Sequence, residues 1–185
     1  MIITVIPAKG GSKRLPGKNM AILNGKPMID YSIKSASESK CTDLVYVSTD
    51  DDYIANYVQK KGLQVIRRPV SLGGEIPIIE VYRHAIKYIN KSNINILVGL
   101  QPDHPDRKIK IDEAIEIFRE ASADRLMSTE KDGTKNGAHY ILSDYFIKTG
   151  TSRKDVTIID DCTNIHYIED LEKAAKNLPL WNFNL

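Results

Sequence analysis

Hydrophobic runs and amphipathic segments alternate along the first two-thirds of the chain. Residues 2–6 form a continuous β-branched run, which is typical of a strand buried on both faces. Further apolar runs of this kind cover residues 44–47, 64–66 and 94–100. Between them, apolar residues recur at helical spacing over residues 27–36, 54–58, 78–89 and 111–121. Strands that alternate with helices predict an α/β fold with a mainly parallel sheet and right-handed crossovers.

Two local features indicate where predicted helices begin. Pro27 suits the first turn of the helix over residues 27–36, because proline is tolerated at that position. The polar run 48–51 follows the strand over 44–47 and can cap the helix that contains residues 54–58.

The alternation changes after Arg125. Residues 138–142 and 156–160 indicate shorter strands, and residues 168–177 indicate a closing helix. No internal repeat, low-complexity tract or linker interrupts the chain, so we expect a single domain over residues 1–185.

The composition is that of an ordinary globular chain. Of its 185 residues, 42% are hydrophobic and 27% are charged, which argues against disorder and supplies a core that needs no disulfide or structural metal. Lys and Arg number 26 against 24 Asp and Glu, so the net charge of +2 excludes a strongly basic nucleic-acid-binding protein. Cys41 and Cys162 form no CxxC pair, as expected of reduced cysteines. No segment resembles a membrane span or a signal peptide, so we expect a soluble, cytoplasmic protein.

The stretch after the first predicted strand concentrates glycine and positive charge. Gly10 and Gly11 are adjacent, and four cations lie within ten residues around them: Lys9, Lys13, Arg14 and Lys18. Open parallel sheets bind ligands beyond the carboxyl ends of their strands. Backbone N–H groups of a glycine loop at this position can bind an anion, and the four cations would neutralise a triphosphate.

Two common phosphate-binding patterns do not match this loop. A P-loop requires four residues between its glycines and then Lys-Ser/Thr, but five residues separate Gly11 from Gly17 and Lys18 precedes Asn19. The dinucleotide pattern GxGxxG fails because Gly10 and Gly11 are adjacent.

The loop instead resembles the opening motif of cytidylyltransferases that activate acidic sugars, the CMP-N-acylneuraminate synthetases and CMP-Kdo synthetases. The segment that carries this resemblance is IPAKGGSKRLPGKN, residues 6–19. Weaker matches follow in the family's order: NGKPMI at 24–29, VSTD at 47–50, LQPDHP at 100–105 and NGAHYI at 136–141. The resemblance therefore covers nearly the whole chain.

This resemblance implies a three-layer, Rossmann-like nucleotidyltransferase fold and a reaction with CTP. A sugar hydroxyl would attack the α-phosphorus and release pyrophosphate, so the protein would mainly position the substrates and neutralise charge. Arg14, Lys18 and Asp103 are the implied catalytic residues. The implied nucleotide-binding residues are Ala8, Lys9, Gly10, Gly11, Ser12, Arg14, Lys18, Asn19 and Gln101. Lys9 stands where the family usually has Arg, which loses the bidentate fork.

The resemblance also implies Mg²⁺ as cofactor, held in part by Asp103. The family's second metal segment reads DIDTPEDL, and its two aspartates align with Asn164 and His166 here. Neutral ligands at both positions would weaken attraction for Mg²⁺ and shift preference toward softer ions such as Mn²⁺. Asp160 and Asp161 could substitute as ligands, although a strand-end turn or cap is the simpler interpretation. Weakened metal use, a shifted ligand set and loss of catalysis all stay open.

Four further polar residues are candidates for substrate contacts. Arg67 and Arg68 resemble the family's basic segment after the third strand and are weak candidates for anion contacts. His104 and Arg107 lie beside Asp103 and could meet the substrate, although His104 fits a polar loop residue better than a catalytic base.

The chain is short for the family it resembles. Only residues 130–135 lie where the family usually inserts a long hairpin that reaches across a dimer and contacts the acidic sugar. Without this arm, an unusual acceptor is more plausible and a homodimer stays open. The aromatic tail, residues 181–185, is expected to fold back onto the body or to contact a second subunit.

Three functional hypotheses follow. The first is transfer of CMP from CTP to an acidic sugar, a sialic-acid-like or Kdo-like 2-keto acid. The second is transfer to another acid, such as a phosphonate or a sugar phosphate. The third is a catalytically degenerate relative that binds nucleotide without turnover. All three predict small-molecule ligands and give no signal for nucleic acid or membrane.

Overall fold

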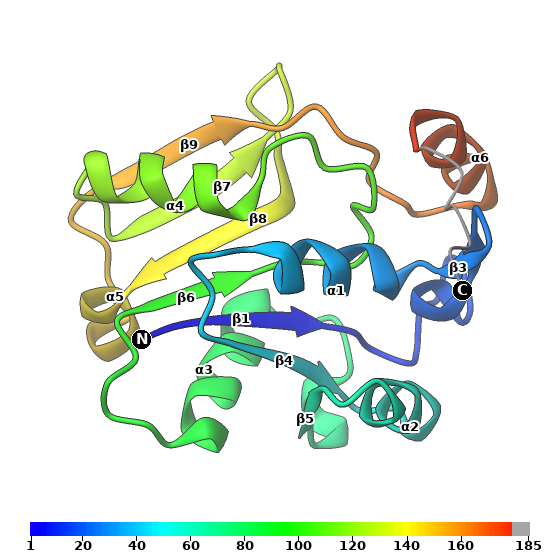
Figure 1. Cartoon of the computed structure of the whole chain (residues 1–185), viewed down its shortest axis with the longest axis horizontal. Helices are drawn as coiled ribbons and strands as arrows, with labels where there is room; N and C mark the ends of the chain where they lie inside the picture. The colour runs from blue at the N-terminus through cyan, green and yellow to red at the C-terminus, as the bar shows by residue number, and fades with distance from the viewer. Residues whose placement is uncertain (179–185) are drawn as a thin grey trace.

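The computed structural model describes residues 1–178. A seven-stranded sheet lies in the middle of the molecule, with helices on both faces (Figure 1). Its strands are β1 (Ile2–Pro7), β4 (Leu44–Thr49), β5 (Gln64–Arg67), β6 (Ile96–Gly99), β7 (Arg125–Thr129), β8 (Lys135–Ser143) and β9 (Asp155–Ile159). The helices are α1 (Ile29–Glu38), α2 (Asp52–Lys60), α3 (Ile78–Ile89), α4 (Ile111–Glu120), α5 (Asp144–Thr149) and α6 (Ile168–Asn177).

The strand order is β5-β4-β1-β6-β8-β7-β9. The first four strands in this order are mutually parallel. β8 is antiparallel to both of its neighbours, and β9 pairs in parallel with β7. The prediction of a three-layer α/β fold with a mainly parallel sheet is confirmed.

The central strand β1 shows why the sheet is covered on both faces. Successive side chains of a strand point to opposite faces. Ile2 and Ile6 pack in a core with residues of α1, α2 and α4. Ile3 and Val5 pack in a second core with residues of α3 and α5. A strand buried on both sides must be apolar throughout, which explains the continuous β-branched run.

The prediction that Pro27 opens a helix is wrong. Pro27 lies in β3 (Lys26–Pro27), which pairs antiparallel with β2 (Ile22–Leu23). Asn24 and Gly25 connect the two strands with φ angles of 45° and 86°, as a type I′ hairpin turn requires. The helix α1 therefore begins two residues later, at Ile29.

A third core fixes the C-terminal segment next to this hairpin. Leu23 and Met28 pack there with Ile165 and with Leu171 and Ala174 of α6. Figure 1 shows α6 beside the β2–β3 hairpin, far along the chain from it. This contact holds the segment before α6 at the carboxyl end of β1.

Two elements after residue 125 were not predicted. β7 follows α4 directly, and α5 follows β8, where the Ser143 hydroxyl accepts a hydrogen bond from the N–H of Phe146 and caps the helix. β7 and β8 are joined by a tight turn, in which Glu130 N–H donates to Thr134 O at 2.8 Å. This turn occupies the position at which the sequence lacks a long arm. The predicted contact of the aromatic tail falls on residues 181–185, outside the described residues.

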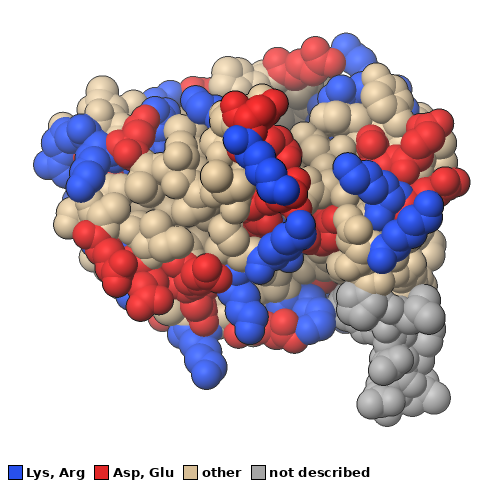
Figure 2. Space-filling model, turned by 90° about the horizontal axis from the view of Figure 1, so that it is seen from above, with Lys and Arg blue, Asp and Glu red and all other residues tan. Residues whose placement is uncertain are grey.

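The surface carries charges of both signs. Figure 2 shows Lys and Arg interspersed with Asp and Glu over the face seen there, as the near-balanced composition predicts. Within residues 1–178, no helix has the length and apolar character needed to cross a membrane.

Candidate functional site

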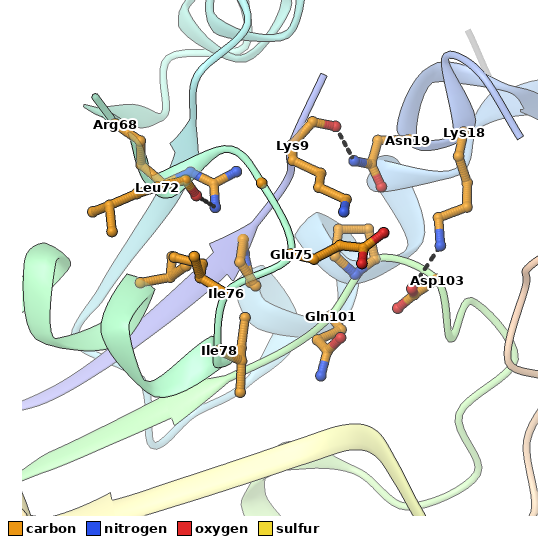
Figure 3. Close-up of a pocket in the computed structure, with 14 residues that line it drawn as sticks. Lys9, Lys18, Asn19, Arg68, Leu72, Glu75, Ile76, Ile78, Gln101 and Asp103 are labelled. Carbon is orange, nitrogen blue, oxygen red and sulfur yellow. Dashed lines mark hydrogen bonds and ion pairs between the residues drawn. The ribbon is translucent and has the colours of Figure 1, made fainter. Parts of the chain in front are cut away.

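The loops that follow β1, β5 and β6 at their carboxyl ends line one pocket of about 440 Å³. Since these strands are parallel, the loops that follow them meet at one edge of the sheet. Five of the predicted site residues line the pocket: Lys9, Lys18, Asn19, Gln101 and Asp103. Figure 3 shows the three from the loop after β1 facing the two from the loop after β6.

Lys18 and Asp103 form an ion pair inside this pocket. Lys18 Nζ lies 2.7 Å from Asp103 Oδ2, and the side chains are only 11% and 16% exposed. The same ammonium donates to Ile165 O at 2.9 Å. His104 Nδ1 lies 3.1 Å from the other carboxylate oxygen, but too poorly aligned for a hydrogen bond. Burial would raise the pKa of Asp103, but His104 and Lys18 hold that pKa below the ordinary carboxyl value.

The glycine loop is held by the partly buried carboxylate of Asp50. Gly10 N–H donates to Asp50 Oδ1 at 3.1 Å, so this amide does not face the pocket. A Cβ at Gly10 would come within 2.5 Å of Asp51 Oδ2, which explains why glycine is needed there. At Gly11 nothing lies within 4 Å of such a Cβ, so space for a ligand is open on that side. The Ser12 hydroxyl accepts a hydrogen bond from Leu15 N–H at 3.4 Å.

Other predicted nucleotide-binding residues have structural contacts. Asn19 Nδ2 donates to Lys9 O at 2.8 Å, which leaves the Asn19 amide oxygen available to a ligand. Ala8 is fully buried, and its N–H bonds to Ser48 O at 2.9 Å. Ala8 therefore supports the loop from the sheet side. The Arg14 guanidinium lies outside the pocket lining, 6.0 Å from the centre of the Tyr167 ring.

The structure brings Arg68 into the pocket, and sequence reasoning ranked this residue low. Arg68 Nη2 lies 3.4 Å from Asp50 Oδ1, the oxygen that also accepts from Gly10. Burial lowers the pKa of the Arg68 guanidinium. Arg67 instead pairs with Asp52 at the surface and does not line the pocket. The sequence offered only the pair of adjacent arginines, because strand alternation decides which of them turns inward.

Sequence reasoning also missed the wall opposite the glycine loop. This wall comes from the segment between β5 and α3, whose match to the family is poor. It adds one acidic and several apolar side chains to the pocket, namely Leu72, Glu75, Ile76 and Ile78. Figure 3 shows Leu72, Ile76 and Ile78 across the pocket from Lys18. Glu75 instead reaches toward the glycine loop, and its carboxylate lies 3.3 Å from Lys13 Nζ. A lining that is largely apolar with few polar groups is typical of a small-molecule site.

Asn164 and His166 lie on either side of Ile165, in the segment that contacts the Asp103 loop. The buried side chain of Ile165 anchors the segment, and its N–H donates to Asp103 O at 2.9 Å. Burial lowers the pKa of His166, and Arg14 and Lys18 lower it further.

Three buried atoms in this group have no hydrogen-bond partner, namely Asp103 Oδ1, Asn164 Oδ1 and His166 Nδ1. Within residues 1–178, no three His, Cys, Asp or Glu side chains lie close enough to hold a metal ion by themselves. The donor set therefore fits a divalent cation that takes most of its remaining oxygens from substrate phosphates and water.

Asp160 and Asp161 do not provide an alternative ligand set. Asp160 is 1% exposed, and its carboxylate accepts from the N–H groups of Lys108 and Ile109 and contacts His139 Nε2 at 3.2 Å. Asp161 faces solvent and pairs with a surface lysine. The two residues follow the end of β9, and Asp160 holds the backbone of residues 108–109.

The expected substrate contact of Arg107 is wrong. Its guanidinium donates to Ala138 O at 2.7 Å and to Ser32 Oγ at 3.0 Å, inside the protein and away from the pocket. His104 is 1% exposed, so it is a packed loop residue. The thiol of Cys162 is also buried, which raises its pKa to about 12 and keeps it protonated.

Comparison with known proteins identifies the family. The family model described as cytidylyltransferase matches residues 3–173. The chain belongs to the cytidylyltransferase family. The resemblance carried by the glycine loop and the later motifs is thereby confirmed.

Curated relatives of this chain are named for acidic-sugar substrates. An 8-amino-3,8-dideoxy-manno-octulosonate cytidylyltransferase from Shewanella amazonensis is 33% identical over 129 residues, covering 69% of this chain and 51% of that protein. A 3-deoxy-manno-octulosonate cytidylyltransferase from Hydrogenovibrio crunogenus is 33% identical over 159 residues, covering 84% and 59%. A CMP-N,N'-diacetyllegionaminic acid synthase from Legionella pneumophila is 48% identical over 64 residues, covering 35% and 28%. The chain spans about half the length of the curated relatives it matches.

Solved structures support the fold over nearly the full chain. A CMP:2-keto-3-deoxy-manno-octonic acid synthetase complexed with CTP has a TM-score of 0.74 at 17% identity, covering 95% of this chain and 97% of that chain. A cytidylyltransferase from Leptospira borgpetersenii has a TM-score of 0.69 at 21% identity, covering 94% and 84%. At these identities the likeness shows the nucleotidyltransferase fold.

Proposed function

We propose that this cytidylyltransferase transfers CMP from CTP to a hydroxyl group of an acidic sugar. The acceptor oxygen forms a bond to the α-phosphorus, the bond from that phosphorus to the β-phosphate oxygen breaks, and pyrophosphate leaves. The hydroxyl proton is released to solvent. The observation that carries this proposal is the Lys18–Asp103 pair, which lies in a pocket bordered by the glycine loop.

In this proposal the charged residues of the pocket region contact the phosphates, and the uncharged amides contact the nucleoside. Lys9, Arg14 and Lys18 place positive charge around the position of the triphosphate, where charge develops on the leaving pyrophosphate. Gly11 and Ser12 lie outside the lining of the pocket, and in this proposal their backbone contacts the phosphates at its edge. Asn19 and Gln101 offer amide groups to the nucleoside, with Arg68 behind them. These roles follow from position and donor chemistry.

A divalent cation belongs to this proposal as cofactor. Asp103 would hold it with the substrate phosphates, and Asn164 and His166 would complete the protein's share. When bound, Mg²⁺ or Mn²⁺ neutralises phosphate charge and polarises the α-phosphorus. One carboxylate with two neutral donors favours Mn²⁺ more than a site built from three carboxylates would.

The molecular context belongs to the proposal as well. Residues 1–185 form one domain without a dimerisation arm, and CTP and a sugar acid are its ligands. In place of the arm, a short turn closed by the hydrogen bond from Glu130 N–H to Thr134 O joins β7 and β8. An acceptor with few contacts beyond its acid group fits this arrangement, and so does a homodimer built without the arm.

A pyrophosphate-release assay tests the proposal. CTP, UTP, GTP and ATP are each offered with a panel of 2-keto sugar acids, sugar phosphates and phosphonates, in Mg²⁺ and in Mn²⁺. We expect release with CTP and a sugar acid and little with the other nucleotides. Release only with a phosphonate or a sugar phosphate would replace the proposed acceptor.

A second candidate function is nucleotide binding without turnover. It is favoured by one observation, the neutral Asn164 and His166 at positions where the family has aspartate. CTP binding by calorimetry without pyrophosphate release for any acceptor would establish this alternative.

A further inference from the structure

The loop that carries Gln101 and Asp103 is held from behind by Arg107. Besides Ala138 O and Ser32 Oγ, the guanidinium donates to His104 O and to Gln101 O. It therefore binds both ends of residues 101–104 and ties them to β8 and α1. The loop that carries two pocket residues is in this way fixed to a strand and a helix.

Gly137 supports the same loop from a second side. Its φ is +80°, and a Cβ added there would lie 2.2 Å from Gln101 Nε2. The Gln101 amide therefore lies against the bare Cα of Gly137. Gly133, four residues earlier in the turn between β7 and β8, has φ +87° but nothing within 4 Å of an added Cβ. Both glycines relieve the same backbone strain, and only Gly137 makes room for a pocket side chain.

The partners of the Arg107 guanidinium suggest a role beyond stabilising the fold. Its hydrogen bonds go to three carbonyls and a hydroxyl, which are uncharged, and burial lowers the pKa of the guanidinium. Keeping a charged group away from water without a hydrogen-bonded counter-ion is costly. The planar fork provides several donors of fixed direction at once, which a lysine cannot reproduce. The arrangement thus trades stability for a fixed loop behind the pocket.

We propose that Arg107 and Gly137 are positioning residues, which hold Gln101 and Asp103 opposite the glycine loop for nucleotide binding and transfer. Neither residue lines the pocket, so each acts through the 101–104 loop. The inference rests on the proposed function, because it takes CTP as the ligand that the loop receives.

The role of Gly137 is tested with a matched pair of variants. Gly137→Ala and Gly133→Ala impose the same backbone strain, so both should lower the midpoint of thermal unfolding by a similar amount. Only Gly137→Ala should displace Gln101, and we expect it to raise the Kd for CTP, measured by calorimetry, about 10-fold. Equal CTP affinity in the two variants would overturn this role.

A double-variant cycle identifies the route of the effect. If Gly137→Ala acts through Gln101, adding it to Gln101→Ala should change the Kd for CTP little further. Full additivity of the two changes would show that Gly137 acts elsewhere and would overturn the assignment.

The role of Arg107 is tested by enzyme kinetics with a second control variant. Arg107→Lys keeps the charge but loses the fork, whereas Arg153→Lys removes a similar fork from Asp124 at a distant site. Both should lower thermal stability. We expect only Arg107→Lys to lower kcat, by about 100-fold, because Asp103 is misplaced. Unchanged kcat and KM in Arg107→Lys would overturn its positioning role.

Wild-type protein is the reference for both the Gly137 and the Arg107 experiments. If it binds no CTP by calorimetry, the proposed function fails and the inference fails with it. If it binds CTP and the Gly137 and Arg107 variants bind and react as it does, only the positioning roles are overturned.

Discussion

At the scale of single residues, Lys18 is the group on which the pocket depends most. Its ammonium has three donors, and two of them bond to Asp103 Oδ2 and Ile165 O. One donor is left for a phosphate oxygen, so Lys18 can join the two strand-end loops and the substrate together. The ion pair with Asp103 lies in a partly buried place.

Removing the Lys18 charge should therefore affect catalysis more than stability. We expect Lys18→Met to lower kcat/KM for CTP by about 100-fold or more, the usual effect of losing one donor to developing charge. Lys148→Met is the control, because Lys148 is an exposed residue paired with Asp144 on α5. Steady-state kinetics with pyrophosphate detection measure both. Similar losses in the two variants would contradict the role of Lys18.

The identity of residue 166 should set the metal preference. His166→Asp restores an oxygen ligand beside Asp103, which favours Mg²⁺ over Mn²⁺. We expect the ratio of the Kd values for Mg²⁺ and Mn²⁺, measured with CTP present by paramagnetic resonance competition, to fall in this variant. Asp161→Asn, which changes an exposed carboxylate nearby, should leave the ratio unchanged. An unchanged ratio in His166→Asp would exclude His166 as a ligand.

At the scale of elements, the site is made by the register of four parallel strands. Apolar runs and amphipathic spacing predicted these strands and the helices between them, because both faces of the sheet are buried. The hairpin of β2 and β3 was missed although Asn24-Gly25 is a strong turn signal, because Pro27 also suits a helix start. β7 and α5 were missed because short elements in an antiparallel region leave little periodicity.

The cap of α2 shows a local prediction that succeeded. The polar run after β4 was expected to cap the next helix, and Asp51 Oδ1 accepts the N–H of Ile54 at 2.8 Å. We expect Asp51→Ala to lower the free energy of unfolding by about 1 kcal/mol in urea denaturation. Asp52→Ala, one residue later and exposed, should cost less. Equal costs would show that the cap contributes nothing.

For the candidate site, some residues could be predicted from sequence motifs and others only from the structure. The glycine loop, Gln101 and Asp103 could be found from motifs, because their positions after strands are local. The sequence could not predict that Arg68 lines the pocket or that Arg107 hydrogen-bonds inside the protein. Both depend on which loops meet in space. The hydrogen bond from Gly10 N–H to Asp50 could not be predicted for the same reason, because it joins two loops.

At the scale of the whole molecule, buried histidine makes stability depend on pH. Burial lowers the pKa of His139, which is fully buried against Asp160. Burial also lowers the pKa of His84 and His166. The unfolded chain takes up protons near pH 6.5 that these folded side chains do not, so stability is full above this pH and falls below it.

We therefore expect the free energy of unfolding to fall between pH 7.5 and 5.5, with each such histidine contributing up to about 1.4 kcal/mol per pH unit. Urea denaturation at several pH values measures the slope. His139→Gln should reduce the slope, because glutamine takes up no proton in the unfolded chain. The same slope in wild type and His139→Gln would contradict the assignment.

The whole molecule has almost balanced charge, and three of its 26 cations, Lys9, Lys18 and Arg68, line one pocket. The central claim is transfer of CMP to an acidic sugar. It is tested most directly by single turnover with CTP labelled at the α-phosphate, in the presence of 2-keto sugar acids. The account predicts that the label moves from CTP into a sugar-linked CMP, and that Lys18→Met slows this transfer. Label that stays in CTP with every acceptor, or appears only as free CMP, would contradict it.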